Sequence, residues 1–270
     1  MVRSSSIPGQ SSSALRASPI VYAHRGASFE LPENTIEAFG RALELGADAL
    51  ETDAHLTRDG RVVLAHDPSG MRMAGVPREI RDCTFAEVRE WDVGARFVAR
   101  GRQGEAPPRE ARPYRIPTLD EALAAFPGVV FNVDAKQEAP DMVPALLRVI
   151  RAAKAEDRVR IASFSARNLR RVRALGYEGE TGLAPVEVVR ALFAPGPLAR
   201  CRGNAAQVPV RGWGITFATP KVLDRLHGLG LRVDFWTIDD PEEARRLFAM
   251  GADGVMTDDP RRVAGAIRGR

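Results

Sequence analysis

Short apolar runs, each followed by a stretch with apolar residues at helical spacing, alternate along most of this chain of 270 residues. Continuous apolar runs are typical of parallel strands that are buried on both faces. Eight such runs occur, at residues 20–23, 47–53, 128–134, 159–164, 180–184, 205–208, 232–236 and 254–257. Eight strand and helix units in about 250 residues predict an α/β fold, the (β/α)8 or TIM barrel. The alternative is a doubly wound open sheet, but the Gly-rich nucleotide-binding loop that often marks it follows none of the runs.

The segments between the runs carry helix signals. Residues 35–45 place apolar side chains at helical spacing, and Gly46 follows as a helix stop. Thr118, followed three residues later by Glu121, resembles a capping box and predicts a helix over 118–126. Further helical stretches are predicted at 166–175, 186–193, 220–229 and 241–250.

Residues 67–117 interrupt the alternation of strands and helices. Just before them, the turn at residues 58–60 predicts a hairpin whose second strand covers residues 62–65. The interrupting segment contains the run ARGRQGEAPPREARP at residues 99–113, which is too rich in Arg, Gly and Pro to fill a strand. We therefore predict an insertion between this hairpin and the next helix, over one mouth of the barrel. It would act as a lid that touches the substrate, or it would be a solvated loop without function.

The overall composition narrows the class of protein. The 39 basic and 35 acidic side chains give a formal charge of +4, which favours anionic ligands and does not require nucleic acid. Cys83 and Cys201 lie far apart and have no metal-ligand spacing, so we expect reduced thiols. Residues 1–19 are rich in Ser and contain no continuous apolar run, which predicts a flexible leader rather than a signal peptide or membrane span. We expect one barrel domain over 20–270 in the cytoplasm, without stable membrane insertion. An unusual export signal and the oligomeric state stay open.

Polar residues stand where several predicted strands end. They are His24, Arg25, Glu51, Asp53, His66, Asp67, Asp134 and Lys136. Such side chains are costly to bury unless they are paired or bind a ligand. Because barrel enzymes carry their reactive groups at the C-terminal ends of the strands, we expect these residues to form the functional site.

The acidic residues among them suggest a metal site. Glu51 and Asp53 are two residues apart in a predicted strand, so their carboxylates point to the same side and repel each other. A divalent cation bound through oxygen would relieve this repulsion, and Asp134 would supply a third carboxylate from the next strand. The residues include no cluster of sulfur or histidine ligands, so Mg²⁺ or Ca²⁺ is favoured over zinc. The alternative is that these are surface carboxylates on a poorly formed strand.

Histidine is rare, with four residues in the chain. His24 and His66 stand at the ends of predicted strands and are candidates for a general acid and a general base. A histidine at such a place is otherwise a hydrogen-bonded core residue. His55 and His227 are predicted to be structural or solvent-facing.

Lysine is rarer still, and Arg supplies most of the positive charge. Lys136 is one of three lysines among 39 basic residues, and it follows the predicted third strand. Its compact ammonium suits a phosphate oxygen, and Arg25 adds a bidentate phosphate donor. The alternative for Lys136 is a simple salt bridge to Asp134. Together, the histidines, the cation site and these two positive charges predict a site for phosphoryl transfer.

Several of these motifs, taken in order, resemble the glycerophosphodiester phosphodiesterase family. The resemblance rests on AHRGASFELPENTIEAF, LETDAHLTRDGRVVLAHD, IPTLDEAL, FNVDAK and FWTIDDPEEARRLFAMGADGVMTDDP, and it extends from Ile20 to Pro260. It implies a (β/α)8 barrel with a small insertion after the second strand. The implied reaction is the hydrolysis of glycerophosphodiesters to sn-glycerol 3-phosphate and an alcohol, and it depends on a divalent metal.

The resemblance also implies roles for individual residues. His24 and His66 would be the acid and base, Arg25 and Lys136 would hold the phosphate, and Glu51 and Asp53 would bind the metal. Glu33 would line the site and order Arg25 or the cation. Trp236 would give the substrate an apolar wall, unless it is ordinary barrel core.

One motif departs from the family pattern. The family usually has N-x-E-x-K after the third strand, whereas this chain has Asp134 between Asn132 and Lys136. Asp is one methylene shorter than Glu, so metal affinity or metal choice is expected to differ. Two other functions stay open: a lysophospholipase D-type phosphodiesterase that acts on larger lipids, and a barrel that binds a phosphate ligand without catalysis.

Overall fold

The computed structural model describes residues 19–99 and 113–268. The predicted leader therefore lies outside the described residues except for its last residue, and so does most of the Arg-rich run at 99–113.

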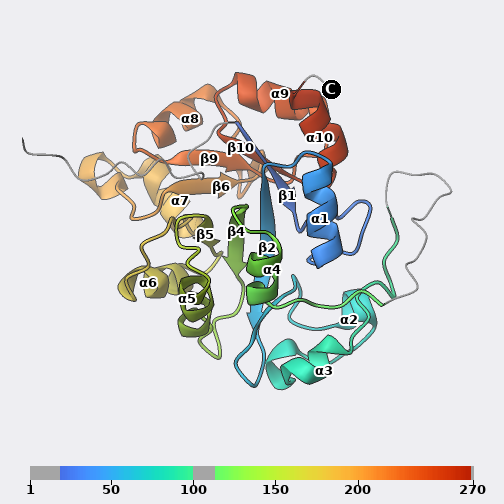
Figure 1. The fold of residues 1–270 in the computed structure, drawn as a ribbon. Coiled ribbons are helices and arrows are strands. Elements are labelled where there is room, and N and C mark those ends of the chain that lie inside the picture. The colour runs from blue at the N-terminus through green and yellow to red at the C-terminus, as the bar shows by residue number, and fades with distance from the viewer. Residues whose placement is uncertain (1–18, 100–112, 269–270) are drawn as a thin grey trace, which may run out of the picture.

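Seven parallel strands form the central sheet, in the order β5-β4-β2-β1-β10-β9-β6 (Figure 1). They are β1 (Ile20–His24), β2 (Ala49–Leu56), β4 (Val130–Ala135), β5 (Val159–Ala162), β6 (Ala205–Val208), β9 (Arg232–Phe235) and β10 (Gly254–Thr257). Two isolated parallel bridges, Ile161 with Thr181 and Gly182 with Ala205, connect β5 to β6 and complete the ring. The predicted (β/α)8 barrel is confirmed.

The fifth predicted strand, at 180–184, is wrong as a full strand. Only the two bridges at Thr181 and Gly182 occupy that position of the ring. Helix α7 begins at Pro185 directly afterwards. Proline has no backbone N–H to donate to a ladder and its fixed φ suits the first turn of a helix, so the chain leaves the sheet at this point.

Helices cover the outside of the barrel, and the sequence shows why they begin where they do. Thr118 and Glu121 form the predicted capping box of α4, and Thr35 caps α1 through the backbone N–H of Ala38. Helices α7 to α10 each have proline in the first turn. The bounds are α1 (Ile36–Glu44), α4 (Leu119–Ala125), α5 (Val143–Ala152), α6 (Ala166–Ala174), α7 (Pro185–Phe193), α8 (Pro220–His227), α9 (Pro241–Ala249) and α10 (Pro260–Ile267).

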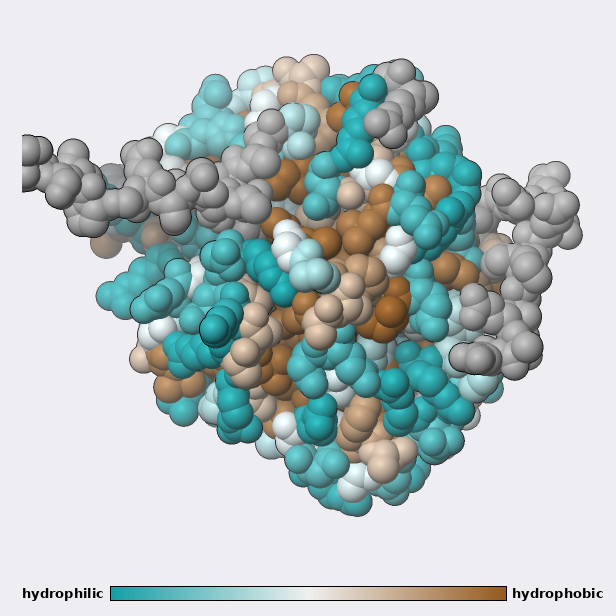
Figure 2. Space-filling view, in the orientation of Figure 1, coloured by the Kyte–Doolittle hydropathy of each residue, from teal (hydrophilic) through white to brown (hydrophobic). Residues whose placement is uncertain are grey.

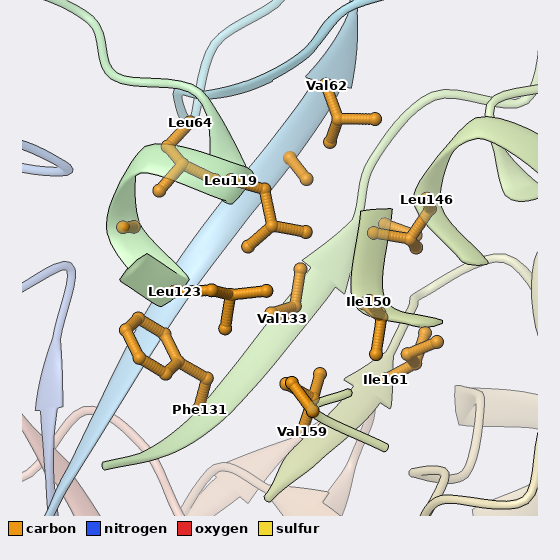
Figure 3. Packing of buried hydrophobic residues seen from close by; sticks show 14 of the residues in the cluster. Val62, Leu64, Leu119, Leu123, Phe131, Val133, Leu146, Ile150, Val159 and Ile161 are labelled. Atoms are coloured by element: carbon orange, nitrogen blue, oxygen red, sulfur yellow. The ribbon is translucent and has the colours of Figure 1, made fainter. Parts of the chain in front are cut away.

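The largest apolar core lies between the strands and this layer of helices. Figure 3 shows Leu119 and Leu123 of α4 facing Phe131 and Val133 of β4, with residues of α5 and β5 continuing the same layer. Phe131 is fully buried and packs edge-to-face against Phe39 of α1 at 6.2 Å between ring centroids. Such close packing fixes the strands, and therefore the side chains at their ends.

The inside of the barrel contains buried charged groups beside a small apolar cluster that includes Tyr22. Arg160 of β5 is fully buried, and its guanidinium lies 2.7 Å from Glu180 and 2.9 Å from Asp234 of β9. It also donates to the Tyr22 hydroxyl of β1 at 2.9 Å. Buried charges are tolerated when they are paired and hydrogen-bonded, and this group connects strands on opposite sides of the ring.

The described residues between 67 and 117 form an addition beside the barrel, after the second strand and its hairpin partner. After β3 (Val62–Leu64), which pairs antiparallel with β2, the chain forms α2 (Met71–Ala74), a 3₁₀ turn (Ile80–Asp82) and α3 (Phe85–Arg89). In Figure 1, α2 and α3 lie together, away from the helices of the outer layer. The addition has its own small core, which includes Trp91. It is therefore more ordered than the predicted loop in its described part.

Two further features complete the fold. A short hairpin of β7 (Arg211–Gly212) and β8 (Ile215–Thr216) follows β6, and a 3₁₀ turn (Gly196–Ala199) follows α7. In Figure 2, hydrophilic residues cover most of the periphery of the face shown, while hydrophobic residues appear mainly in its middle. Among the helices that the structure describes, none is long and apolar enough to span a membrane. Cys83 and Cys201 are free thiols.

Candidate active site

The strand register brings the predicted polar residues to one end of the barrel. His24 is in register with Glu51, and Asp53 is in register with Asp134. Side chains of alternate residues in a strand share a face, so Glu51 and Asp53 both point into the barrel. A pocket of about 200 Å³ opens here. It is lined by eight of the nine predicted site residues: His24, Arg25, Glu51, Asp53, His66, Asp134, Lys136 and Trp236.

Lys136 lies between two carboxylates of this pocket. Its Nζ is 2.8 Å from Asp53 Oδ1 and 2.6 Å from Asp134 Oδ2, so the predicted salt bridge exists and includes a second partner. Arg25 Nε is 3.0 Å from Asp53 Oδ2. Burial opposes ionisation of Asp53, but the charges of Lys136 and Arg25 outweigh it and lower the pKa of Asp53 to about 2. Asp53 is therefore an anion at neutral pH.

Glu51 and Asp134 are neutralised less fully by neighbouring positive charges than Asp53 is. Burial, reinforced by the negative charge of Asp53, raises the pKa of Glu51 to about 7. Glu51 Oε2 accepts a hydrogen bond from the backbone N–H of Arg25 at 3.1 Å. Burial also raises the pKa of Asp134, and its Oδ1 is buried without a hydrogen-bond partner among the described residues. Glu51 and Asp134 thus face the same pocket, and a positive charge placed there would stabilise the ionised form of both carboxyl groups.

This donor set fits a hard divalent cation. Three carboxyl groups on adjacent strands match the oxygen ligands of Mg²⁺ or Ca²⁺, and the unpartnered Asp134 Oδ1 is an available lone pair. In the described part of the chain, no three acidic, histidine or cysteine side chains already enclose an ion-sized site. The ammonium of Lys136 lies between Asp53 and Asp134 instead.

His24 is held by a residue that directly follows the last strand. Its Nδ1 lies 2.6 Å from Asp258 Oδ1, just after β10, and Ser28 Oγ donates to the same oxygen at 3.0 Å. Its Nε2 lies on the side of Glu51, at 3.9 Å from Oε2. Burial alone would lower the pKa of His24, but the hydrogen bond to Asp258 and the charge of Glu51 outweigh it and raise the pKa. Neither Asp258 nor Ser28 was predicted.

His66 is held in a similar way, by the carboxylate next to it in the sequence. Its Nδ1 lies 2.8 Å from Oδ1 of the neighbouring Asp67. His55 Nε2 lies 3.2 Å from the carbonyl oxygen of His66, so His55 is a buried structural residue, as predicted. His227 is exposed and pairs with Asp253 at 2.9 Å, far from the pocket lining. Of the four histidines, His24 and His66 line the pocket, and His55 and His227 do not.

Glu33 lies behind the pocket wall rather than on it. Its Oε1 is 3.3 Å from Arg25 Nη1, which agrees with the predicted ordering of Arg25. The same carboxylate receives two hydrogen bonds from Arg72 of α2, at 2.6 and 2.9 Å. Arg72 was not predicted, because it belongs to the insertion and follows no strand.

The opposite wall of the pocket is apolar. Trp236 lines it and packs edge-to-face with Phe164 at 5.8 Å between ring centroids. Strand β5 ends at Ala162, so Phe164 falls in the following loop and is 58% exposed, although the sequence placed it inside a strand. The wall continues through Leu183, Pro185, Val188, Trp213 and Met256. The pocket is thus charged on one side and apolar on the other.

A closed parallel barrel with carboxylate-supported histidines beside Arg25 and Lys136 defines an enzyme of the barrel phosphodiester hydrolase class. Comparison with known proteins agrees. Residues 24–262 match the sequence profile of the glycerophosphoryl diester phosphodiesterase family. The chain belongs to this family.

Individual relatives cover nearly the whole chain. A glycerophosphodiester phosphodiesterase from Caldanaerobacter subterraneus is 33% identical over 254 residues, 92% of this chain and 98% of the relative. Lysophospholipase D GDPD1 from Homo sapiens is 28% identical over 265 residues, 88% of this chain and 82% of the relative. The crystal structure of a glycerophosphodiester phosphodiesterase from Thermotoga maritima is 26% identical with a TM-score of 0.68, covering 90% of this chain and 95% of that one.

Proposed function

We propose that this enzyme hydrolyses small glycerophosphodiesters to sn-glycerol 3-phosphate and an alcohol, with His24 and His66 as acid and base. One observation carries the proposal. Two histidines, His24 at the end of β1 and His66 just after β3, each have their own carboxylate and face a single pocket that also contains Arg25 and Lys136. Family membership supports the same substrate class.

The proposed mechanism assigns each step to residues of the pocket. Arg25 and Lys136 bind the non-bridging phosphate oxygens and offset the added negative charge. One histidine removes a proton from the nucleophile, which is water or the adjacent glycerol hydroxyl. As the new P–O bond forms, the bond to the departing alcohol breaks, and the other histidine gives that alkoxide a proton. If the glycerol hydroxyl attacks, water opens the cyclic phosphate in a second step of the same kind.

We further propose that Glu51, Asp53 and Asp134 hold a divalent cation, Mg²⁺ or Ca²⁺. When bound, it would supply Lewis-acid stabilisation of the phosphate. The buried, unpartnered Asp134 Oδ1 and the raised pKa of Glu51 support this assignment. Calorimetric titration of chelator-treated protein should show binding of one of these ions, and Asp134→Ala should weaken it. Equal binding by both proteins would remove Asp134 from the ligand set.

The first experiment measures sn-glycerol 3-phosphate release from a panel of glycerophosphodiesters, in chelator and after return of Mg²⁺, Ca²⁺ or Mn²⁺. We expect release that requires the ion. His24→Ala and His66→Ala should each lower turnover by about 10²–10⁴-fold. His227→Ala is the matched control and should leave turnover unchanged, since its side chain lies on the exposed surface. Near-normal turnover in both pocket variants would overturn the histidine assignment.

A second candidate function is lysophospholipase D-type hydrolysis of a lipid with a single acyl chain. The apolar wall from Phe164 to Trp213 favours it, because glycerol and its common head groups are polar. The similarity to a lysophospholipase D points the same way. A series of lysophosphatidylcholines of increasing chain length tests it. Each methylene group that packs on the apolar wall should raise kcat/KM by about threefold to fourfold. If kcat/KM does not depend on chain length, the lysophospholipase D-type function is excluded.

A further inference from the structure

Arg72 connects two separate parts of the site from outside the pocket. It belongs to α2 in the insertion, and its guanidinium fork donates to both oxygens of Glu33, at 2.6 and 2.9 Å. Its Nε donates to Asp67 Oδ2 at 2.5 Å. One side chain therefore satisfies two carboxylates that come from different segments of the chain.

Each of those carboxylates holds a residue of the proposed mechanism. Glu33 lies 3.3 Å from Arg25 Nη1, and Asp67 lies 2.8 Å from His66 Nδ1. A continuous line of contacts thus runs from Arg25 through Glu33, Arg72 and Asp67 to His66. Arg72 is absent from the lining of the main pocket and lines a small adjoining cavity instead. It is therefore placed to act on the substrate only through its neighbours.

We propose that Arg72 is a positioning residue that sets the orientations of His66 and Arg25 together, which makes the insertion part of the catalytic machinery. This inference rests on the proposed roles of His66 and Arg25. The guanidinium is suited to the task because it is planar and offers donors in fixed directions to two carboxylates at once. A lysine ammonium at this position would serve one carboxylate well and the other poorly.

Loss of Arg72 would disturb the two ends differently. Asp67 would lose the donor that fixes its second oxygen, so the imidazole of His66 would lose its fixed direction. Arg25 would retain its contact with Asp53 at 3.0 Å, which keeps the guanidinium near the phosphate. We therefore expect the loss to appear mainly in kcat, with a smaller change in KM. Misplacing a catalytic group by about 1 Å costs up to about 10²-fold in rate.

The experiment compares three variants of the full chain on one glycerophosphodiester substrate. Arg72→Ala should lower kcat by at least about tenfold, and Arg72→Lys should fall between it and the wild type. Millimolar guanidinium ion should restore part of the activity of Arg72→Ala, because it fits the space that the side chain leaves. Arg78→Ala is the matched control: Arg78 lies in the same insertion with similar exposure and pairs with Glu87 at 2.9 Å.

The outcomes separate this inference from the proposed function. A wild-type protein without activity on any glycerophosphodiester would overturn the function itself. An active wild type with an equally active Arg72→Ala would overturn the positioning role alone. An inactive Arg72→Ala that guanidinium does not rescue would show that Arg72 only stabilises the insertion, and the tryptophan fluorescence, to which Trp91 of the insertion core contributes, should then differ from that of the wild type.

Discussion

At the residue scale, the two acidic residues in the sequence TDDP show how neighbours in sequence take different roles. Asp259 caps α10 through the backbone N–H of Arg262 at 3.2 Å. Asp258 turns the other way and holds His24. Of these two adjacent aspartates, Asp259 thus stabilises the helix that follows it, and Asp258 orients a candidate catalytic residue from the other end of the chain.

The contact between Asp258 and His24 predicts a shift in pH dependence. Asp258 helps to raise the pKa of His24, so Asp258→Asn should lower that pKa. The limb of the kcat/KM profile that reports His24 should then move to lower pH. This direction holds whether His24 is the acid or the base, since either role follows its protonation. A profile that keeps both limbs in place would show that His24 does not control them.

Much of the site could be predicted at this scale. His24 ends β1, Asp134 is the last residue but one of β4, and Glu51 and Asp53 lie within β2 in register with them; a parallel barrel brings these positions together. Asp258, Ser28, Phe164, Trp213 and Arg72 were missed because they reach the site from loops or from the insertion. Sequence pattern places a loop residue near a strand end, but it does not fix where its side chain points.

At the scale of elements, six helices between the strands were predicted, whereas α5, α10 and the helices of the insertion were not. Helix α4 has a capping box and was predicted, whereas α5 begins at Val143 after Met142, which makes no side-chain cap. The strand at 180–184 was wrong because an apolar run does not distinguish a paired strand from the approach to a helix. Hydrophobic pattern alone therefore identifies elements better than it identifies their pairing.

The packing of β4 against the helices predicts a large effect from one core residue. Phe131 is fully buried among α1, α4 and β4, so Phe131→Ala should destabilise the protein by about 3–5 kcal/mol through lost burial and the remaining cavity. Urea denaturation followed by circular dichroism measures the change. Phe193→Ala is the matched control, because Phe193 is 68% exposed and should change stability by less than about 0.5 kcal/mol. Equal effects would mean that this core is not tightly packed.

At the scale of the whole molecule, two kinds of interior hold the barrel. An apolar layer separates strands from helices, while charged and hydrogen-bonded side chains fill part of the ring itself. The sequence predicted the first from its periodicity. It did not predict the second, because Arg160, Glu180 and Asp234 lie far apart in the chain and only ring closure brings them together.

The buried charges predict a strong penalty when one partner is removed. Arg160→Met would leave Glu180 and Asp234 without the guanidinium that now contacts both. We expect a loss of about 3–5 kcal/mol in the free energy of unfolding. Arg246→Met, which removes an exposed ion pair on α9, should cost less than about 1 kcal/mol. A loss below that level for Arg160→Met, in the same denaturation assay, would show that the ring does not depend on this group.

The ring has one seam, where two isolated bridges replace a strand between β5 and β6. The carboxylates of β2 and β4 lie on the continuously paired part of the ring, whereas Leu183, Pro185 and Val188 of the apolar wall follow the seam. Thermal opening of the barrel should begin there, with amide hydrogens of 181–183 exchanging faster than those of β4. On the proposed roles, the chemistry belongs to the continuously paired part of the ring, and part of the substrate wall follows the seam. Over evolutionary time, substrate range could change along the seam while the reaction stays the same.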